Sequence, residues 1–202
     1  MDAAHPVDSA RNDVVGTPVS APVFVIGEEE PGDVAAREAL LDRAMGQNRK
    51  RKSSEKLRRG RLPARGLALV ARASDDTLVG TVRLWNVTLG EGGCDALLLG
   101  PLAVEPERKG EGIGSALMLE AIARARVLGH AAIVLVGDPE YYARFGFSAE
   151  KTGNLVMPGP FEKRRLLALE LVPAALDGAS GIISASEAID AGSSRSRIRA
   201  AA

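Results

Sequence analysis

The chain has 202 residues, the usual size of a single domain, which is long enough to bury a substantial core. Its 26 Lys and Arg residues balance its 26 Asp and Glu residues, and a neutral chain is not expected to bind nucleic acid in general. A single cysteine, Cys94, excludes an internal disulfide and favours a reducing compartment. The two histidines and the cysteine lie far apart, so the sequence predicts no metal site.

The two ends of the chain differ in composition from its middle. Residues 1–21 are polar, with scattered Pro, Ser and Asp, and predict a flexible leader. They lack the basic start and apolar centre of a signal peptide, and no stretch approaches the ~20 apolar residues of a membrane span. We therefore expect a cytoplasmic protein with no membrane partner. The Ser, Ala and Gly content of residues 178–202 predicts a flexible tail, which leaves residues 22–177 as the domain.

The domain is expected to begin with a strand and a helix. Val23–Ile26 is a short β-rich run, which acidic residues and a Pro-Gly pair then end. Residues 35–45 have helical composition, with Asp33 as a candidate N-cap and Gly46 as the residue that ends the helix.

Residues 49–61 hold eight basic residues and one acid. Ser53 or Ser54 is placed to cap a short helix within this basic run. The run is interpreted first as a solvated helix and loop, and second as a rim that attracts an acidic substrate or partner. Nucleic acid is disfavoured because no aromatic side chain interleaves the charges for base stacking.

A β-meander follows the basic run. Residues 66–72 and 77–87 predict a hairpin around Asp75 and Asp76, and Gly80 predicts a bulge in its second strand. Alternation places Arg83 and Trp85 on one face, where they are candidates to line an acceptor pocket, although Trp85 is also a typical core residue. The apolar run from Leu97 to Val104 predicts a buried third strand.

The centre of the chain predicts a strand, a glycine loop, a helix and another strand. Gly110, Gly112 and Gly114 precede a helix over residues 115–129, and residues 131–136 predict the second strand. Four apolar residues can share the buried face of this helix: Ile113, Leu117, Ala121 and Leu128. Glu120 and Arg124, four residues apart, are expected to pair on its solvent face.

The glycine loop predicts an anion site. Glycine allows positive φ and close approach of a ligand to the backbone, and the first amides of a helix have no partner within it. These amides carry the positive end of the helix dipole, so a phosphate is a natural occupant. Lys109 and Arg108 add positive charge, whereas Glu111 is expected to point away from the anion.

Two phosphate-binding interpretations compete. A dinucleotide-binding module would have G-x-G-x-x-G directly after a strand and an acid after the next strand, a role that Asp138 superficially fits. Here, however, the spacing is G-x-G-x-G, and a polar insertion over residues 105–108 separates strand from loop.

Residues 102–106 (LAVEP) and 109–114 (KGEGIG) resemble the motif of the GNAT superfamily of N-acetyltransferases. That motif is a strand ending in L-x-V-x-P, followed by Gln or Arg, two residues, Gly, any residue, and Gly or Ala. The first loop position is Lys109 instead of Gln or Arg, and Arg108 stands one residue too early to replace it. This departure affects the side-chain contact but not the backbone amides.

A second segment carries the same resemblance. Residues 138–147 (DPEYYARFGF) look like the family's F-Y-x-x-x-G-F segment, with Tyr141 in the first aromatic position. The run from Leu97 to Leu171 looks most like the YhbS-type branch of the superfamily. The resemblance covers residues 22–177 and implies the fold class, α/β (an α+β mixed sheet). This GNAT acyl-CoA N-acyltransferase fold has an antiparallel meander followed by a β-α-β cofactor-binding unit.

The resemblance also implies the chemistry of the site. The cofactor is acetyl-CoA, and the implied binding residues are Leu102, Ala103, Val104, Lys109, Gly110, Glu111, Gly112, Ile113 and Gly114. The amide of Ala103 would polarise the thioester carbonyl. By the same resemblance Tyr142 is the general acid that protonates the leaving thiolate.

No residue stands out as the base that an ammonium group requires. Glu55, Asp138, Glu140 and an ordered water all remain candidates. Cys94 is interpreted as an inert thiol, because nothing pairs it with a histidine.

The resulting prediction is an acetyl-CoA-dependent N-acetyltransferase in which a primary amine attacks the thioester directly. A non-catalytic acyl-CoA sensor on the same fold and a dinucleotide-binding module remain as alternatives. The expected partners are a small-molecule or peptide amine and, for a homodimer, a second copy of the chain; neither nucleic acid nor a membrane is expected.

Overall fold

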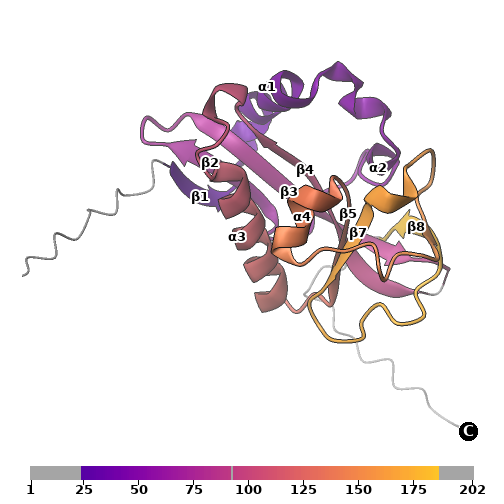
Figure 1. Cartoon of the computed structure of the whole chain (residues 1–202). Coiled ribbons are helices and arrows are strands. Elements are labelled where there is room, and N and C mark those ends of the chain that lie inside the picture. The colour runs from indigo at the N-terminus through magenta and orange to yellow at the C-terminus, as the bar shows by residue number, and fades with distance from the viewer. Residues whose placement is uncertain (1–23, 92, 187–202) are drawn as a thin grey trace, which may run out of the picture.

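A mixed β-sheet forms the centre of the computed structural model, which describes residues 24–91 and 93–186 (Figure 1). Its main path runs β1-β2-β3-β4-β5-β7, and every neighbouring pair on it is antiparallel except the parallel pair β4–β5. The predicted meander and crossover are therefore confirmed. The strands are β1 (Phe24–Glu28), β2 (Ala68–Ala73), β3 (Leu78–Leu89), β4 (Cys94–Val104), β5 (Ala132–Val136), β6 (Leu155–Val156), β7 (Leu166–Glu170) and β8 (Gly181–Ala185).

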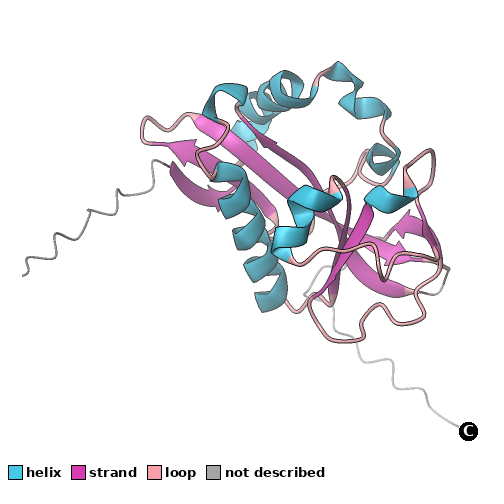
Figure 2. Ribbon diagram, viewed as in Figure 1, coloured by secondary structure: helices cyan, strands magenta, loops and turns pink. Residues whose placement is uncertain are grey.

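Helices cover both faces of the sheet (Figure 2). They are α1 (Val34–Met45), α2 (Ser53–Lys56), α3 (Ile113–Val127) and α4 (Pro139–Tyr142), with short 3-10 turns between elements. None of the helices in the described part of the chain is long and apolar enough to cross a membrane.

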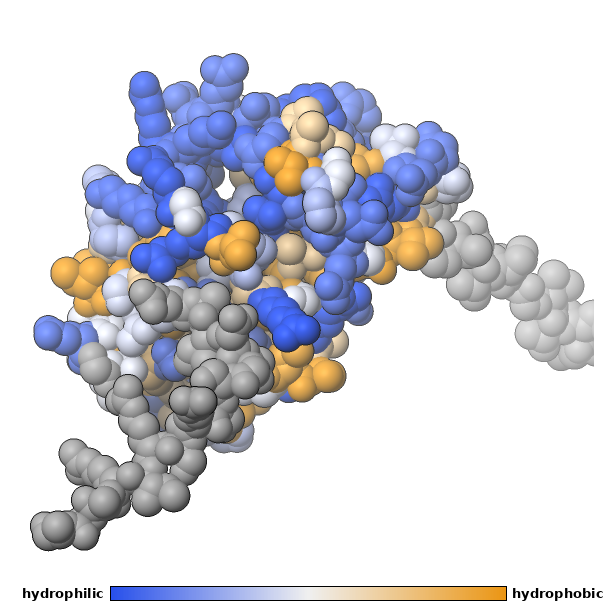
Figure 3. Space-filling model, turned by 180° about the vertical axis from the view of Figure 1, so that it is seen from behind, coloured by the Kyte–Doolittle hydropathy of each residue, from blue (hydrophilic) through white to orange (hydrophobic). Residues whose placement is uncertain are grey.

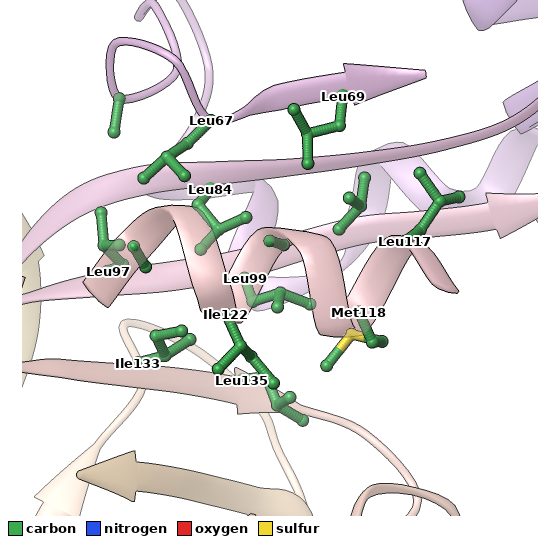
Figure 4. Packing of buried hydrophobic residues seen from close by; sticks show 14 of the residues in the cluster. Leu67, Leu69, Leu84, Leu97, Leu99, Leu117, Met118, Ile122, Ile133 and Leu135 are labelled. Carbon is green, nitrogen blue, oxygen red and sulfur yellow. The ribbon is translucent and has the colours of Figure 1, made fainter. Parts of the chain in front are cut away.

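Helix α3 packs on one face of the sheet and builds the larger part of the core there. Its residues Leu117, Met118 and Ile122 point at strand side chains such as Leu84 and Leu99, all of which are buried (Figure 4). Burying a side chain of this size contributes roughly 1.5–3 kcal/mol, so α3 is fixed firmly to the strands beneath it.

Gly80 allows the close approach of α3 to β3. A Cβ on Gly80 would lie 2.9 Å from Ile113 Cγ2 and equally close to Leu117 Cδ1. The predicted bulge is present beside this glycine: Ala71 pairs with Gly80 but Arg72 pairs with Leu78, which leaves an extra residue on β3.

The opposite face of the sheet is covered by two different parts of the chain. Helix α1 buries Leu40 and Leu41 against Val70, Leu78 and Ala103. Further along, the segment that follows α4 packs over Trp85, Val87 and their neighbours, with Leu155, Met157, Leu176 and Ile183 buried there. Seen from behind, the hydrophobic residues at the surface lie in separate patches among hydrophilic ones (Figure 3).

Strand β8 corrects the prediction that a flexible tail begins at residue 178. It pairs antiparallel with β3, from Val87–Ala185 to Leu89–Ile183, along the edge of β3 beyond its pairing with β2. It also pairs with β6, and Ile183 is fully buried. The Ser, Ala and Gly content of this segment concealed a strand whose stability comes from its partners. The predicted leader, residues 1–21, and residues 187–202 lie outside the described residues.

One local prediction was confirmed in position only, and two were wrong. Asp33 lies at the N-cap position of α1 but makes no capping bond; its carboxylate accepts from the Glu30 amide at 2.8 Å and from Arg72 at 2.5 Å. Ser53 is the first residue of α2, so Lys52 occupies the cap position that Ser53 or Ser54 was expected to fill. Leu128 follows the end of α3, at the C-cap position, and is half exposed.

Candidate active site

The two central strands separate where the sequence predicts the cofactor. Parallel pairing of β4 with β5 extends only over Leu97–Ile133 and Leu98–Val134, although both strands continue further. Beyond that point β4 pairs only with β3, and a bulge places Arg83 opposite both Gly100 and Pro101. Trp85 on β3 donates its indole N–H to the Gly100 carbonyl at 2.7 Å, which ties this bulge to the sheet.

This divergence leaves one edge of β4 unpaired by β5 at Leu102, Ala103 and Val104. All three residues line a pocket of about 720 Å³ that also includes Val136 and Gly137 at the end of β5. An unpaired strand edge inside a pocket can hydrogen-bond an extended ligand that carries amide groups.

The glycine loop closes the other end of this large pocket. Gly110 and Gly112 have φ of 92° and 81°, and Gly112 occupies the N-cap position of α3. No side chain among the described residues caps the helix. Its first backbone bond runs from the Ala116 amide to the Gly112 carbonyl, so the preceding amides at Ile113, Gly114 and Ser115 have no partner within the helix.

Positive charge surrounds these amides. The charged residues that line the large pocket are one acid, Asp138, and the cations Lys52, Arg108, Lys109, Arg144 and Arg165. Glu111 does not line it; its carboxylate accepts from Arg108 at 2.6 and 2.9 Å, so it points away as the sequence predicted. The loop therefore suits a ligand with several negative charges.

Tyr142 stands where the large pocket meets a second, smaller one. It is the last residue of α4, whose first turn is capped by Asp138 Oδ1, an acceptor for the Glu140 amide at 3.2 Å. Its ring lies edge-on to Tyr141 and Phe147 and lines both pockets. Burial raises the pKa of Tyr142 to about 12, so its phenol keeps its proton throughout the neutral range.

The smaller pocket has a volume of about 100 Å³ and lies beyond Tyr142. Its walls are the β4 bulge at Gly100 and Pro101, the ends of β4 and β5, and the basic run with Arg49, Lys52, Glu55 and Arg58. The two pockets thus share Tyr142 in their walls, and the β4 bulge borders the smaller one.

Residues 64–149, which contain the β-meander, the glycine loop and Tyr142, match the family model of the acetyltransferase (GNAT) domain. Over these residues the chain resembles the GNAT acetyltransferase domain. It is 28% identical over 160 residues to the uncharacterized N-acetyltransferase YhbS of Escherichia coli strain K12, an alignment that covers 79% of this chain and 95% of YhbS.

Solved structures of GNAT proteins share the arrangement of this domain. The crystal structure of YhbS from Escherichia coli in complex with CoA has a TM-score of 0.70 and 28% identity, covering 90% of this chain and 94% of YhbS. A GNAT family acetyltransferase from Brucella melitensis in complex with acetyl-CoA has a TM-score of 0.53 and 29% identity, covering 78% of this chain and all of that one. The GNAT fold predicted from the sequence is therefore confirmed.

Around the two pockets, the candidate bases occupy three different environments. Glu55 lines the small pocket and is paired with Arg58 at 3.1 Å. Asp138 lines the large pocket, but its hydrogen bonds with Glu140 hold its carboxyl pKa below the ordinary value and make it a weak base. Glu140 is exposed and lines neither pocket.

Arg83 and Trp85 do not line either pocket, contrary to expectation. Arg83 donates to both carboxylate oxygens of Glu29, at 2.7 and 2.8 Å, and Trp85 is buried in the core. Cys94 lies at the start of β4 and lines neither pocket. In the part of the chain that the structure describes, no group of three or more His, Cys, Asp or Glu side chains is arranged to hold a metal ion.

Arg49 and Arg58 are the residues that the sequence interpretation missed. The basic run was interpreted as a solvated surface, yet both arginine side chains are only 10% exposed. Arg49 is paired with Glu38 at 2.6 Å and Asp42 at 2.8 Å, on α1. The Gly100–Pro101 pair inside an apolar strand was an available signal for the bulge, because neither residue suits a regular central strand.

Proposed function

We propose that this domain transfers the acetyl group of acetyl-CoA to the amino group of a small-molecule or peptide acceptor, with Tyr142 as general acid. The observation that carries the proposal is the position of Tyr142, which lies between a large pocket with free helix amides and a small pocket beyond the β4 bulge. The CoA and acetyl-CoA bound to the two GNAT relatives support the choice of cofactor.

Acetyl-CoA would supply the acetyl thioester. The amides of residues 109–114 and the surrounding cations suit its phosphates, since they lie at the start of α3. The free edge of Leu102, Ala103 and Val104 suits the amide groups of its pantetheine arm. In this pose the Ala103 amide would hydrogen-bond the thioester oxygen and stabilise the charge that develops on it.

Tyr142 would give its phenolic proton to the departing sulfur as the carbon–sulfur bond breaks. The pKa of about 12 lies above the ordinary thiol value of about 8.5, a gap that corresponds to roughly 5 kcal/mol against full transfer. A thiolate in the same pocket is also deprived of water, which raises its own pKa and narrows the gap. Burial therefore keeps Tyr142 protonated and available as a donor, and it also makes the phenol a weaker acid.

Glu55, or a water bound to it, would take the proton that the attacking amine loses. Among the candidate carboxylates it is the one that lines the small pocket with Tyr142. Its carboxylate already accepts a hydrogen bond from Arg58 at 3.1 Å, so a water that relays the proton is the better acceptor.

Binding of the cofactor is tested first, by thermal unfolding with CoA or NAD. CoA should raise the melting temperature, because a ligand that binds only the folded state stabilises it. Gly112→Ala should reduce this shift, because φ of 81° at the N-cap strains any side chain. Stabilisation by NAD but not by CoA would indicate a dinucleotide-binding module instead.

Catalysis is tested by following acetyl-CoA consumption across a panel of amines, with mass spectrometry of the products. Tyr142→Phe should lower kcat by roughly 100-fold or more while CoA affinity is retained, because only the proton donor is removed. Tyr141→Phe removes the neighbouring hydroxyl, which lies by Gly114, and should act on cofactor affinity more than on kcat. CoA binding without acetylation of any amine would indicate a non-catalytic sensor, and an unchanged kcat in Tyr142→Phe would exclude this residue as the acid.

A further inference from the structure

Arg58 is a buried cation with unused hydrogen-bonding capacity. Its side chain is 10% exposed, and its Nε atom is completely buried, with no hydrogen-bond partner among the residues that the structure describes. The bonds that it makes are from Nη2, to Glu55 at 3.1 Å and to Ser54 Oγ at 3.4 Å. Leaving a buried donor unpaired costs about 1–3 kcal/mol, and more when the group is charged, so a native chain rarely keeps one without a reason.

The guanidinium lies beside the β4 bulge and lines the small pocket together with Tyr142. Its Nη1 atom is 3.7 Å from the position that a Cβ would take on Gly100. It does not hold the bulge by bonding the Gly100 carbonyl, because the Trp85 indole N–H occupies that acceptor. Arg58 therefore faces the small pocket, the chamber in which the acceptor amine must lie next to Tyr142.

The charges around this chamber leave room for an anion. Arg49 is neutralised by Glu38 and Asp42 on α1, and Glu55 alone offsets Arg58 and the exposed Lys52. The pKa of Arg58 is lowered, first by burial and then by the nearby Arg49 and Arg83, against the opposing effect of Glu55. A second negative charge in the chamber would relieve this cost.

We propose that Arg58 binds a carboxylate of the acceptor, so that the substrate class is a primary amine bearing a carboxylate close to its amino group. The proposal rests on the proposed acetyltransferase function. A guanidinium is a preferred donor to a carboxylate, and the Nη1 atom beside Gly100 makes no hydrogen bond among the described residues and so is the donor available to it. The pocket of about 100 Å³, against the roughly 10–15 Å³ that one water needs, admits a small group only, which keeps carboxylate and amine close together.

The test compares amines that differ only in the charge of one group. Glycine, β-alanine and γ-aminobutyrate are each measured against the corresponding carboxamide, with acetyl-CoA consumption giving kcat/KM. At the best spacer length, the acid should exceed its amide by roughly tenfold or more, as expected for a charge-assisted bond in a buried site. Binding of the same amines to the CoA complex is measured by calorimetry, which does not depend on turnover.

Arg58→Met should reduce the ratio of kcat/KM for the acid to kcat/KM for its amide to about one. Arg58→Lys should restore part of this preference. Arg58→Met leaves Glu55 without its partner and could prevent folding. The double variant, Arg58→Met with Glu55→Gln, removes both charges of the pair and is used if the single variant does not fold. Arg59→Met is the matched control, because Arg59 is the exposed neighbour in sequence and makes only a long bond to the Lys50 carbonyl, at 3.5 Å. The control should keep the wild-type ratio.

The outcomes separate this inference from the proposed function. Preferential binding of the acids that depends on Arg58 supports the inference even if no thioester is consumed, in which case the acetyltransferase proposal fails. Acetylation of acids and amides at equal rates, or a preference that survives in Arg58→Met, overturns the inference and leaves the acetyltransferase proposal in place.

Discussion

At the scale of single residues, burial sets the chemistry of Tyr142. The phenol packs between Tyr141, Phe147 and the backbone of Gly137, and this environment disfavours the phenolate. The folded chain therefore holds the proton more tightly than the unfolded chain does. The stability that follows is present below pH 10, the ordinary pKa of the group, and is lost as the pH rises towards about 12.

This shift is directly measurable because the chain has only two tyrosines. In an alkaline titration followed by tyrosinate absorbance, we expect the component that Tyr142→Phe removes to have a midpoint of about 12. If the component that disappears in Tyr142→Phe instead has a midpoint near 10, the phenol is hydrated in the folded protein and burial does not raise its pKa.

Gly137 is the residue that leaves space for this ring. A Cβ at position 137 would lie 2.2 Å from Tyr142 Cε2, far inside contact distance. We expect Gly137→Ala to displace the ring, lower the free energy of unfolding by about 1–3 kcal/mol and reduce acetyl transfer along with it. Gly32→Ala is the matched control, since no atom lies within 4 Å of its Cβ position. Urea unfolding checks both, and equal stabilities would show that the ring adjusts without cost.

At the scale of elements, the pairing partners of a segment decide whether it forms a strand. The short strand β8 has no strong pattern of its own, yet it lies on β3 and buries one of two adjacent isoleucines. Ile183 is fully buried in the core on that face, whereas Ile182 is 60% exposed. Strand β8 is therefore part of the domain and not an appendage to it.

The two isoleucines give a test of this assignment. Ile183→Ala should lower the free energy of unfolding by about 2–4 kcal/mol, because it leaves a cavity in the core. Ile182→Ala should change it by less than about 0.5 kcal/mol, as expected for an exposed site. Denaturant unfolding measures the free energy of unfolding of both variants. If both change it by a similarly small amount, β8 does not unfold cooperatively with the rest of the domain.

At the scale of the whole molecule, charge is neutral in sum but uneven in space. The chain balances 26 cationic against 26 acidic residues, yet the large pocket is lined by five cations and one acid. Ion pairs on α1 and in the basic run neutralise much of the remaining charge, as Arg49 does with Glu38 and Asp42. A polyanionic ligand is thus attracted to this pocket.

Ionic strength should reveal this arrangement. Raising NaCl from about 0.05 M to about 0.5 M should weaken CoA binding several-fold, since the Debye length falls from over 10 Å to a few ångströms. Pantetheine, which lacks the phosphates, is the control and should bind almost independently of salt. Calorimetric titration measures the affinity for each ligand. If CoA and pantetheine depend equally on salt, the cations around the glycine loop do not contact the phosphates of CoA.

The sequence by itself determined the central unit of strand, glycine loop, helix and strand, and the GNAT resemblance. Apolar runs such as residues 97–104 and 131–136 are long and continuous, and a backbone at positive φ accepts few residues other than glycine. These features therefore depend on residues that are adjacent in the sequence. The anion site at the start of α3 follows for the same reason, because free amides belong to any uncapped helix.

Only the tertiary structure decided the burial of Arg58, the bulge at Gly100 and Pro101, and the strand at residues 181–185. Each depends on a partner far away in sequence: Arg58 on β4, the bulge on Arg83 and Trp85, and β8 on β3. A basic run considered alone is expected to be solvated. Its burial and its neighbouring charges come from segments that only folding brings close to it.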